Sequence, residues 1–231
     1  MVVLCGCSVK RNNFFSRNYH QLTTRYNVYF NGDQALKSGI KHMENRHKED
    51  YTHLLPVFVS NDEQTRSICS SDMDYVIEKA AKAIDKHSIT AKPRRRKNKD
   101  SKNYQTFRKK KEFNNQLDKC YLLLGKAYFY KKGISNQEDA DCSFTLSQGS
   151  SATTVIQRQY AEDEALMTEV SIWLFRSLTE MGRYEEAARI MDRLDGSTLK
   201  RKQREMVAAA RTDFYVRQGM YEQAIPEAER L

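Results

Sequence analysis

The sequence predicts an all-α protein, an α-solenoid of stacked helical hairpins that is incomplete at its C-terminal end. Its 231 residues contain only 9 Gly and 3 Pro, too few for the frequent turns of a β-sandwich. A turn motif, Gly-x-Tyr-x-x-Ala, begins at Gly182 and again at Gly219, 37 residues later, and a Leu-Gly-x-x-Tyr motif begins earlier, at Leu124. Such periodic self-similarity is typical of helical repeats, which bury their core by stacking.

Composition and motifs divide the chain into four parts. They are a truncated lipoprotein signal (1–7), an N-terminal helical region with tetratricopeptide-like features (8–90), a basic linker (91–112) and tetratricopeptide repeats (113–231).

The first residues are similar to a bacterial lipobox, because Leu4, Gly6 and Cys7 occupy the apolar, small and lipid-accepting positions. We therefore predict that Cys7 carries a lipid and anchors an otherwise water-exposed body to a membrane. Ser8 after it favours the outer membrane. A complete signal has about 7–15 apolar residues, so we expect that the start is misassigned or that upstream residues are missing. A short apolar start of a cytosolic protein is the alternative.

The region 8–90 contains a weak repeat, Tyr19-x-x-Leu22-Thr23-x-x-Tyr26 followed by Ala35, which predicts a helical hairpin. An apolar connector with Pro56 at its centre ends helical structure before a second amphipathic helix, about 71–87.

The segment from Lys92 to Lys111 contains eleven Lys or Arg and one acid, so its net charge of +10 leaves the rest of the chain near neutral. A block of like charge favours a solvated linker. Anionic lipid, an acidic protein or nucleic acid are alternative partners, the last because Tyr104 and Phe107 could stack on bases.

Three tetratricopeptide-like hairpins are predicted in 113–231. The first helix carries Leu124, Gly125 and Tyr128, and its partner helix carries Ala140 and Phe144. The next two hairpins are those with the turns at 182 and 219. Because the last hairpin lacks a polar capping helix, we expect a longer array or a shortened gene product.

No nucleotide-binding, nucleophile-elbow or zincin motif occurs in the sequence. We therefore expect no enzyme, no cofactor, no metal site and no small-molecule substrate. The five cysteines form no CxxC pair.

Three stretches, residues 14–32, 50–58 and 112–130, together resemble the PorW/SprE tetratricopeptide lipoproteins of Bacteroidetes; Tyr-Asn-Val-Tyr-Phe-Asn-Gly at 26–32 is the most specific part. The resemblance implies a non-enzymatic scaffold lipoprotein at the periplasmic side of the outer membrane. It would serve the type IX secretion system, and gliding motility in some members, by binding other periplasmic and outer-membrane components. The chain ends well before a typical family member.

Protein partners are expected on the open surface of the first helices of the hairpins, where aromatic and Arg side chains are typical anchors. The candidate groove residues are His20, Asn27, Lys126, Phe129, Tyr130, Arg176, Glu180 and Arg217. Two alternatives remain: a generic cytosolic peptide-binding module, and, less favoured, a nucleic-acid-binding protein using residues 92–111.

Overall fold

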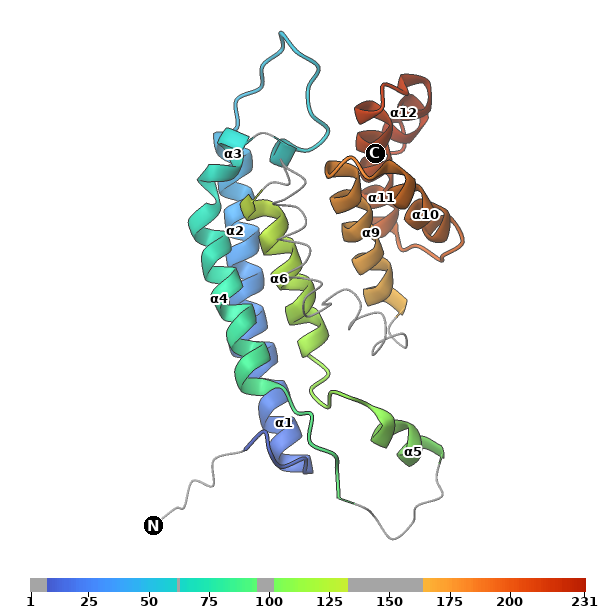
Figure 1. The fold of residues 1–231 in the computed structure, drawn as a ribbon. Helices are drawn as coiled ribbons and strands as arrows, with labels where there is room; N and C mark the ends of the chain where they lie inside the picture. Colours follow the sequence, from blue (N-terminus) through green and yellow to red (C-terminus); the bar gives the residue numbers. More distant parts are fainter. Residues whose placement is uncertain (1–7, 62, 95–101, 133–163) are drawn as a thin grey trace.

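The computed structural model describes residues 8–61, 63–94, 102–132 and 164–231, and every regular element in these ranges is helical (Figure 1). This confirms the predicted all-α class and its helical hairpins. The α-helices are α1 (Phe14–Thr23), α2 (Phe30–Arg46), α3 (Glu63–Ile68), α4 (Ser70–His87), α5 (Lys102–Lys109), α6 (Leu117–Lys132), α9 (Glu164–Glu180), α10 (Tyr184–Asp195), α11 (Arg201–Arg217) and α12 (Tyr221–Ala228). A π-helical segment, η1 (Thr24–Tyr29), and a 3₁₀ turn, η2 (Val59–Asn61), complete the order.

Helices α1 and α2 are one continuous helix, joined through η1 with right-handed helical backbone at both joints. It begins at Asn13, whose side-chain oxygen accepts a hydrogen bond from the Ser16 backbone N–H at 2.7 Å. The hairpin predicted from Tyr19 and Ala35 is therefore wrong, because both residues lie on this helix. No left-handed glycine interrupts it: among the described residues such glycines occur only at 182 and 219.

The π segment keeps one face of this helix on the core. The buried positions repeat every four residues: Ser16, His20, Thr24, Val28, Gly32 and Leu36. An α-helix turns once in 3.6 residues, so a four-residue repeat would drift by about 40° at each step. The wider turn of a π-helix cancels part of this drift in the middle of the run, and Leu36 and Met43 therefore still point into the core.

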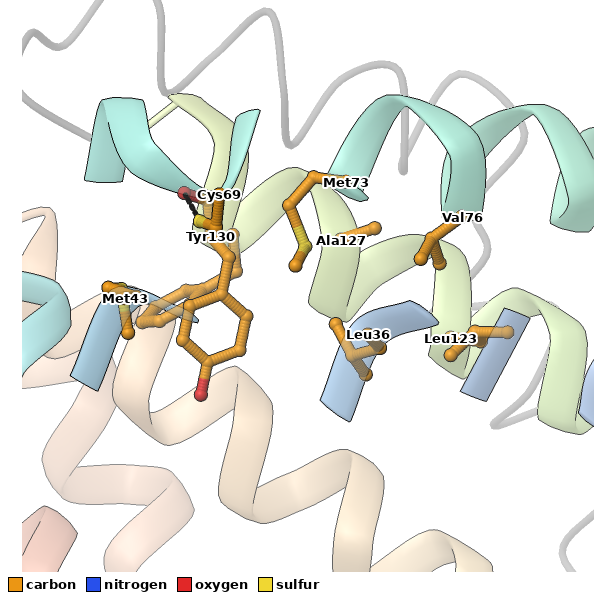
Figure 2. Close-up of a cluster of buried hydrophobic side chains, with 9 residues drawn as sticks. Leu36, Met43, Cys69, Met73, Val76, Leu123, Ala127 and Tyr130 are labelled. Atoms are coloured by element: carbon orange, nitrogen blue, oxygen red, sulfur yellow. Dashed lines mark hydrogen bonds between the residues drawn. The ribbon is translucent and has the colours of Figure 1, made fainter. Parts of the chain in front are cut away.

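Helices α2, α4 and α6 enclose the N-terminal core (Figure 2). Glycines of α2 allow the close approach: a methyl group at Gly32 would lie 2.8 Å from Leu123, and one at Gly39 would lie 2.6 Å from Met73. Gly125 of the Leu-Gly motif differs from these two glycines. Gly125 is exposed, and among the described residues no atom outside its own helix lies within 4 Å of its added methyl group.

The two C-terminal hairpins, α9–α10 and α11–α12, confirm the predicted turns. Gly182 and Gly219 have φ values of 72° and 71°, in the left-handed region that favours glycine. The following N–H groups close both helix ends in the same way, Arg183 to the Leu178 carbonyl and Met220 to the Tyr215 carbonyl, each at 2.9 Å.

Stacking of α9 against α11 makes a second core. The rings of Phe175 and Phe214 lie 5.5 Å apart, and Ala187 of α10 is fully buried beside them. Phe175 stands where such repeats usually have a small residue. Its ring fits because it packs against Phe214 of the adjacent helix α11.

Part of the predicted basic linker is ordered. Residues 102–109 form α5, and Lys92 Nζ donates to the carbonyl oxygens of Arg108 and Lys110 at 3.1 and 2.8 Å. Glu112 then accepts hydrogen bonds from the Ile89 and Asn114 backbone N–H groups, both at 2.8 Å. These bonds join the residues that follow α4 to those that precede α6.

Candidate protein-binding site

A groove of about 740 Å³ opens where α10 and α12 end beside the first half of α11. Leu194, Val207 and Ala208 give it an apolar floor, and all three are buried. The loop 197–199 forms one wall. The groove forms because both hairpins end there. The C-terminal end of α10 leads into α11, and the C-terminal end of α12 packs beside the start of α11.

Arg211 holds the elements of this groove together. Its guanidinium forms ion pairs with Asp195 at the end of α10 and, at 3.4 Å, with Glu227 of α12. Arg230 also pairs with Glu227, at 3.0 Å. The Arg211 and Glu227 side chains are each 13% exposed, so water screens their ion pair less than those of the exposed Asp195 and Arg230.

Among the described residues, four arginines line the groove together with three acids, Asp195, Glu205 and Glu227. Arg201 is 89% exposed and meets Glu205 at 3.1 Å, and Arg204 is also exposed. Guanidinium groups bind carboxylates through paired hydrogen bonds. An apolar floor beneath such a rim suits a protein segment that combines apolar anchors with acidic side chains.

The predicted anchors Phe129 and Tyr130 do not face an open surface; that expectation is wrong. They are 6% and 7% exposed and lie in the core shared by α2, α4 and α6. Both rings pack edge-on against Trp173 of α9, with centroids 5.5 and 5.8 Å away. The Tyr130 carbonyl also accepts from the buried Cys69 thiol (Figure 2). Helix α9 covers this end of α6.

Arg176 and Glu180 are likewise enclosed rather than open to a partner. The Arg176 guanidinium lies 3.9 Å from the centre of the Phe58 ring and 4.5 Å from that of Trp173. Glu180 forms an ion pair with Arg66, and the two side chains are 6% and 8% exposed. These groups join α9 to residues 58–66 instead of lining a groove.

His20 is also buried, against the expectation. Its Nδ1 lies 2.8 Å from Nδ1 of His87, so one ring donates a hydrogen bond and the other accepts it. Burial, and secondly the neighbouring His20, lower the pKa of His87. The pair ties α1 to the end of α4.

The other three candidates are nearer to solvent but lie apart. Asn27 is exposed on η1, Lys126 pairs with Glu169 across α6 and α9, and Arg217 donates to Asp213 at 2.9 Å on α11. The eight candidates therefore do not form one surface.

Two surfaces were missed: the groove, and an exposed line of side chains on the first helix. That line consists of Phe15, Tyr19, Leu22, Tyr26 and Phe30, which we call the aromatic stripe; all are at least 51% exposed. Its spacing of four, three, four and four residues was a readable helical signal. For the groove the sequence carried no comparable sign.

Other predicted features lie outside the described residues, namely Cys7, Ala140 and Phe144. In the described ranges no group of three or more His, Cys, Asp or Glu side chains could hold a metal ion, and no helix there is long and apolar enough to cross a membrane. Burial raises the pKa of the Cys120 thiol to about 12, so it stays protonated near neutral pH.

Comparison with known proteins adds no identification: no protein-family model matches the chain, and no curated protein matches it either.

Proposed function

We propose that this protein is a non-enzymatic scaffold lipoprotein of the type IX secretion system. It is anchored through Cys7 to the outer membrane, faces the periplasm and holds partner proteins at its hairpin surface. The proposal rests on the stacked hairpins α9–α10 and α11–α12, whose ends open an arginine-rimmed groove. The resemblance of residues 14–32, 50–58 and 112–130 to PorW/SprE lipoproteins supports the compartment and the system.

The groove can bind without rearrangement. Its floor is part of the second core and its walls are tied by Arg211, so little conformational entropy is lost when a partner enters. Arg201 and Arg204 at the rim would attract an acidic segment and orient it, and the apolar floor would contact its apolar side chains.

The groove is tested by photo-crosslinking in cells that carry the secretion system. A photoreactive residue replaces Arg204, and a control places it at Arg189, which is exposed on α10 outside the groove. We expect a secretion-system protein to be captured from position 204 alone, and Arg201→Glu to reduce its yield. Equal capture from both positions would contradict a groove-specific role.

The anchor is tested separately by metabolic labelling with palmitate. We expect Cys7→Ser to abolish the label and Cys5→Ser, the matched control two residues earlier, to retain it. A parent chain that takes up no label favours the alternative, a cytosolic peptide-binding module using the same groove, and label that persists in Cys7→Ser would show that Cys7 is not the lipidated residue.

The nucleic-acid alternative is weakened by the contacts of its aromatic side chains. Phe107 packs against Phe113 at 5.1 Å and lies under the Arg17 guanidinium, while the Tyr104 hydroxyl donates to the Arg94 carbonyl at 2.9 Å. These rings are already engaged within the protein. Strong, salt-sensitive binding to single-stranded RNA would restore this alternative.

A further inference from the structure

The aromatic stripe is a line of exposed apolar side chains on the first helix. Its five side chains are 76%, 51%, 57%, 57% and 53% exposed, from Phe15 to Phe30. They lie on the side of the helix opposite the buried face that begins at Ser16. With a rise of 1.5 Å per residue, the stripe is about 22 Å long. Isolated exposed apolar residues are ordinary, but a continuous line of this length marks an interaction surface.

The π segment keeps the stripe straight. Because η1 lies between Leu22 and Phe30, the wider turn that returns Leu36 to the core also holds Tyr26 and Phe30 in line with Phe15. One backbone feature therefore serves the buried face and the exposed face together.

The order of side chains along the stripe reads the same in both directions: Phe, Tyr, Leu, Tyr, Phe. A two-fold axis through Leu22 would place Phe15 opposite Phe30 of a second copy and Tyr19 opposite its Tyr26. An interface between identical chains about such an axis must be self-complementary in this way.

Charge near the stripe selects the antiparallel direction. Residues 1–32 contain four basic residues and no acid, and Asp33 is the first acid. Antiparallel pairing brings Asp33 of one copy toward Lys10 and Arg11 of the other. Parallel pairing would instead place both Lys10–Arg11 pairs together, which is unfavourable.

The area reaches the lower limit for a specific interface. An aromatic side chain buries about 150–250 Å², and more than half of each stripe side chain is exposed. About 100 Å² from each of five residues in two copies gives about 1,000 Å², the size at which specific interfaces begin.

We propose that the aromatic stripe is the interface of an antiparallel, two-fold symmetric homodimer centred on Leu22. The proposal goes beyond the scaffold function and depends on neither the lipid anchor nor the groove.

Sedimentation equilibrium of the full chain tests it, with Cys7→Ser present so that lipid cannot cause association. We expect a concentration-dependent monomer–dimer equilibrium. Leu22→Asp should weaken it at least about tenfold, because two carboxylates would then face each other at the axis. Leu54→Asp is the matched control, since Leu54 is 68% exposed outside the stripe, and it should have no effect. Far-UV circular dichroism should be unchanged in both variants.

The direction of pairing is tested by mixing variants. Tyr19→Glu and Tyr26→Lys should each be monomeric alone and should form a heterodimer together. A heterodimer of Tyr19→Glu with Tyr19→Lys that forms more strongly would overturn the antiparallel arrangement.

The interface itself is refuted by a chain that stays monomeric at about 100 μM, or by equal effects of Leu22→Asp and Leu54→Asp. It is also refuted if a monomeric chain binds phosphatidylglycerol vesicles and Leu22→Asp abolishes that binding, which would assign the stripe to a membrane surface.

Discussion

Two glycines in helix interiors, Gly39 and Gly125, should respond in opposite directions to the same substitution. Gly39→Ala adds a methyl group 2.6 Å from Met73 Cε and 2.8 Å from Asp72 Cβ, and Met73 is fully buried. Gly125→Ala adds one that has no atom of another described element within 4 Å. The intrinsic helix propensity gained is the same at both sites.

That gain is about 1 kcal/mol, since Ala is favoured over Gly in a helix by this amount. Gly125→Ala should therefore stabilise the protein by up to about 1 kcal/mol. At Gly39 the overpacking cost of about 1–3 kcal/mol opposes the gain and leaves a net destabilisation of about 1 kcal/mol. Because the helix-propensity gain is the same in both variants, the difference between their free energies of unfolding gives the steric cost at Gly39, about 2 kcal/mol.

Urea unfolding followed by circular dichroism measures both free energies of unfolding on the same chain. Equal midpoints of the two variants would refute the close approach of α2 and α4 at Gly39. A destabilising Gly125→Ala would show instead that the Leu-Gly motif has the packing role that its sequence suggests.

Three further predictions concern the corrected residues and the hairpin turns. Phe129→Ala should destabilise the protein by about 3–5 kcal/mol, because it empties a core position; a thermal melt unchanged from the parent would return Phe129 to the surface. Gly182→Ala and Gly219→Ala should each cost about 1 kcal/mol, since φ near 70° strains a residue with a side chain, and unchanged urea midpoints would contradict this. The pKa of His87 lies below its ordinary value of 6.5, so the unfolded chain binds more protons there; stability should fall as the pH drops through 6.5. Unfolding free energies at about pH 7.5 and 5.5 should therefore differ less in His87→Gln, and an equal difference would show that His87 is not responsible.

The C-terminal turns could be predicted because their cause is local. A helix that ends in a left-handed residue strongly prefers glycine there, and the Tyr and Ala that follow Gly182 and Gly219 define the second helix. The continuous first helix was missed although its cause was also local. Its buried four-residue period was present in the sequence, but Ala35 fitted a hairpin spacing equally well.

The placement of Phe129, Tyr130 and Arg176 could not be read from their own segments. They are buried by Trp173 and Phe58, which approach from distant parts of the chain. A helix-face pattern identifies which residues lie together on one helix, but not whether another helix covers that face. The groove depends on how two hairpins stack and was therefore equally hidden.

The Arg66–Glu180 ion pair connects positions 114 residues apart in sequence and lies where the N-terminal bundle meets the hairpins. Removing one partner would leave the other charge buried and unpaired, which lowers the free energy of unfolding far more than the loss of a surface ion pair does. This buried ion pair therefore fixes the orientation of the hairpins relative to the N-terminal bundle. Force applied to a partner bound in the groove would be transmitted through the ion pair to the helices of the bundle.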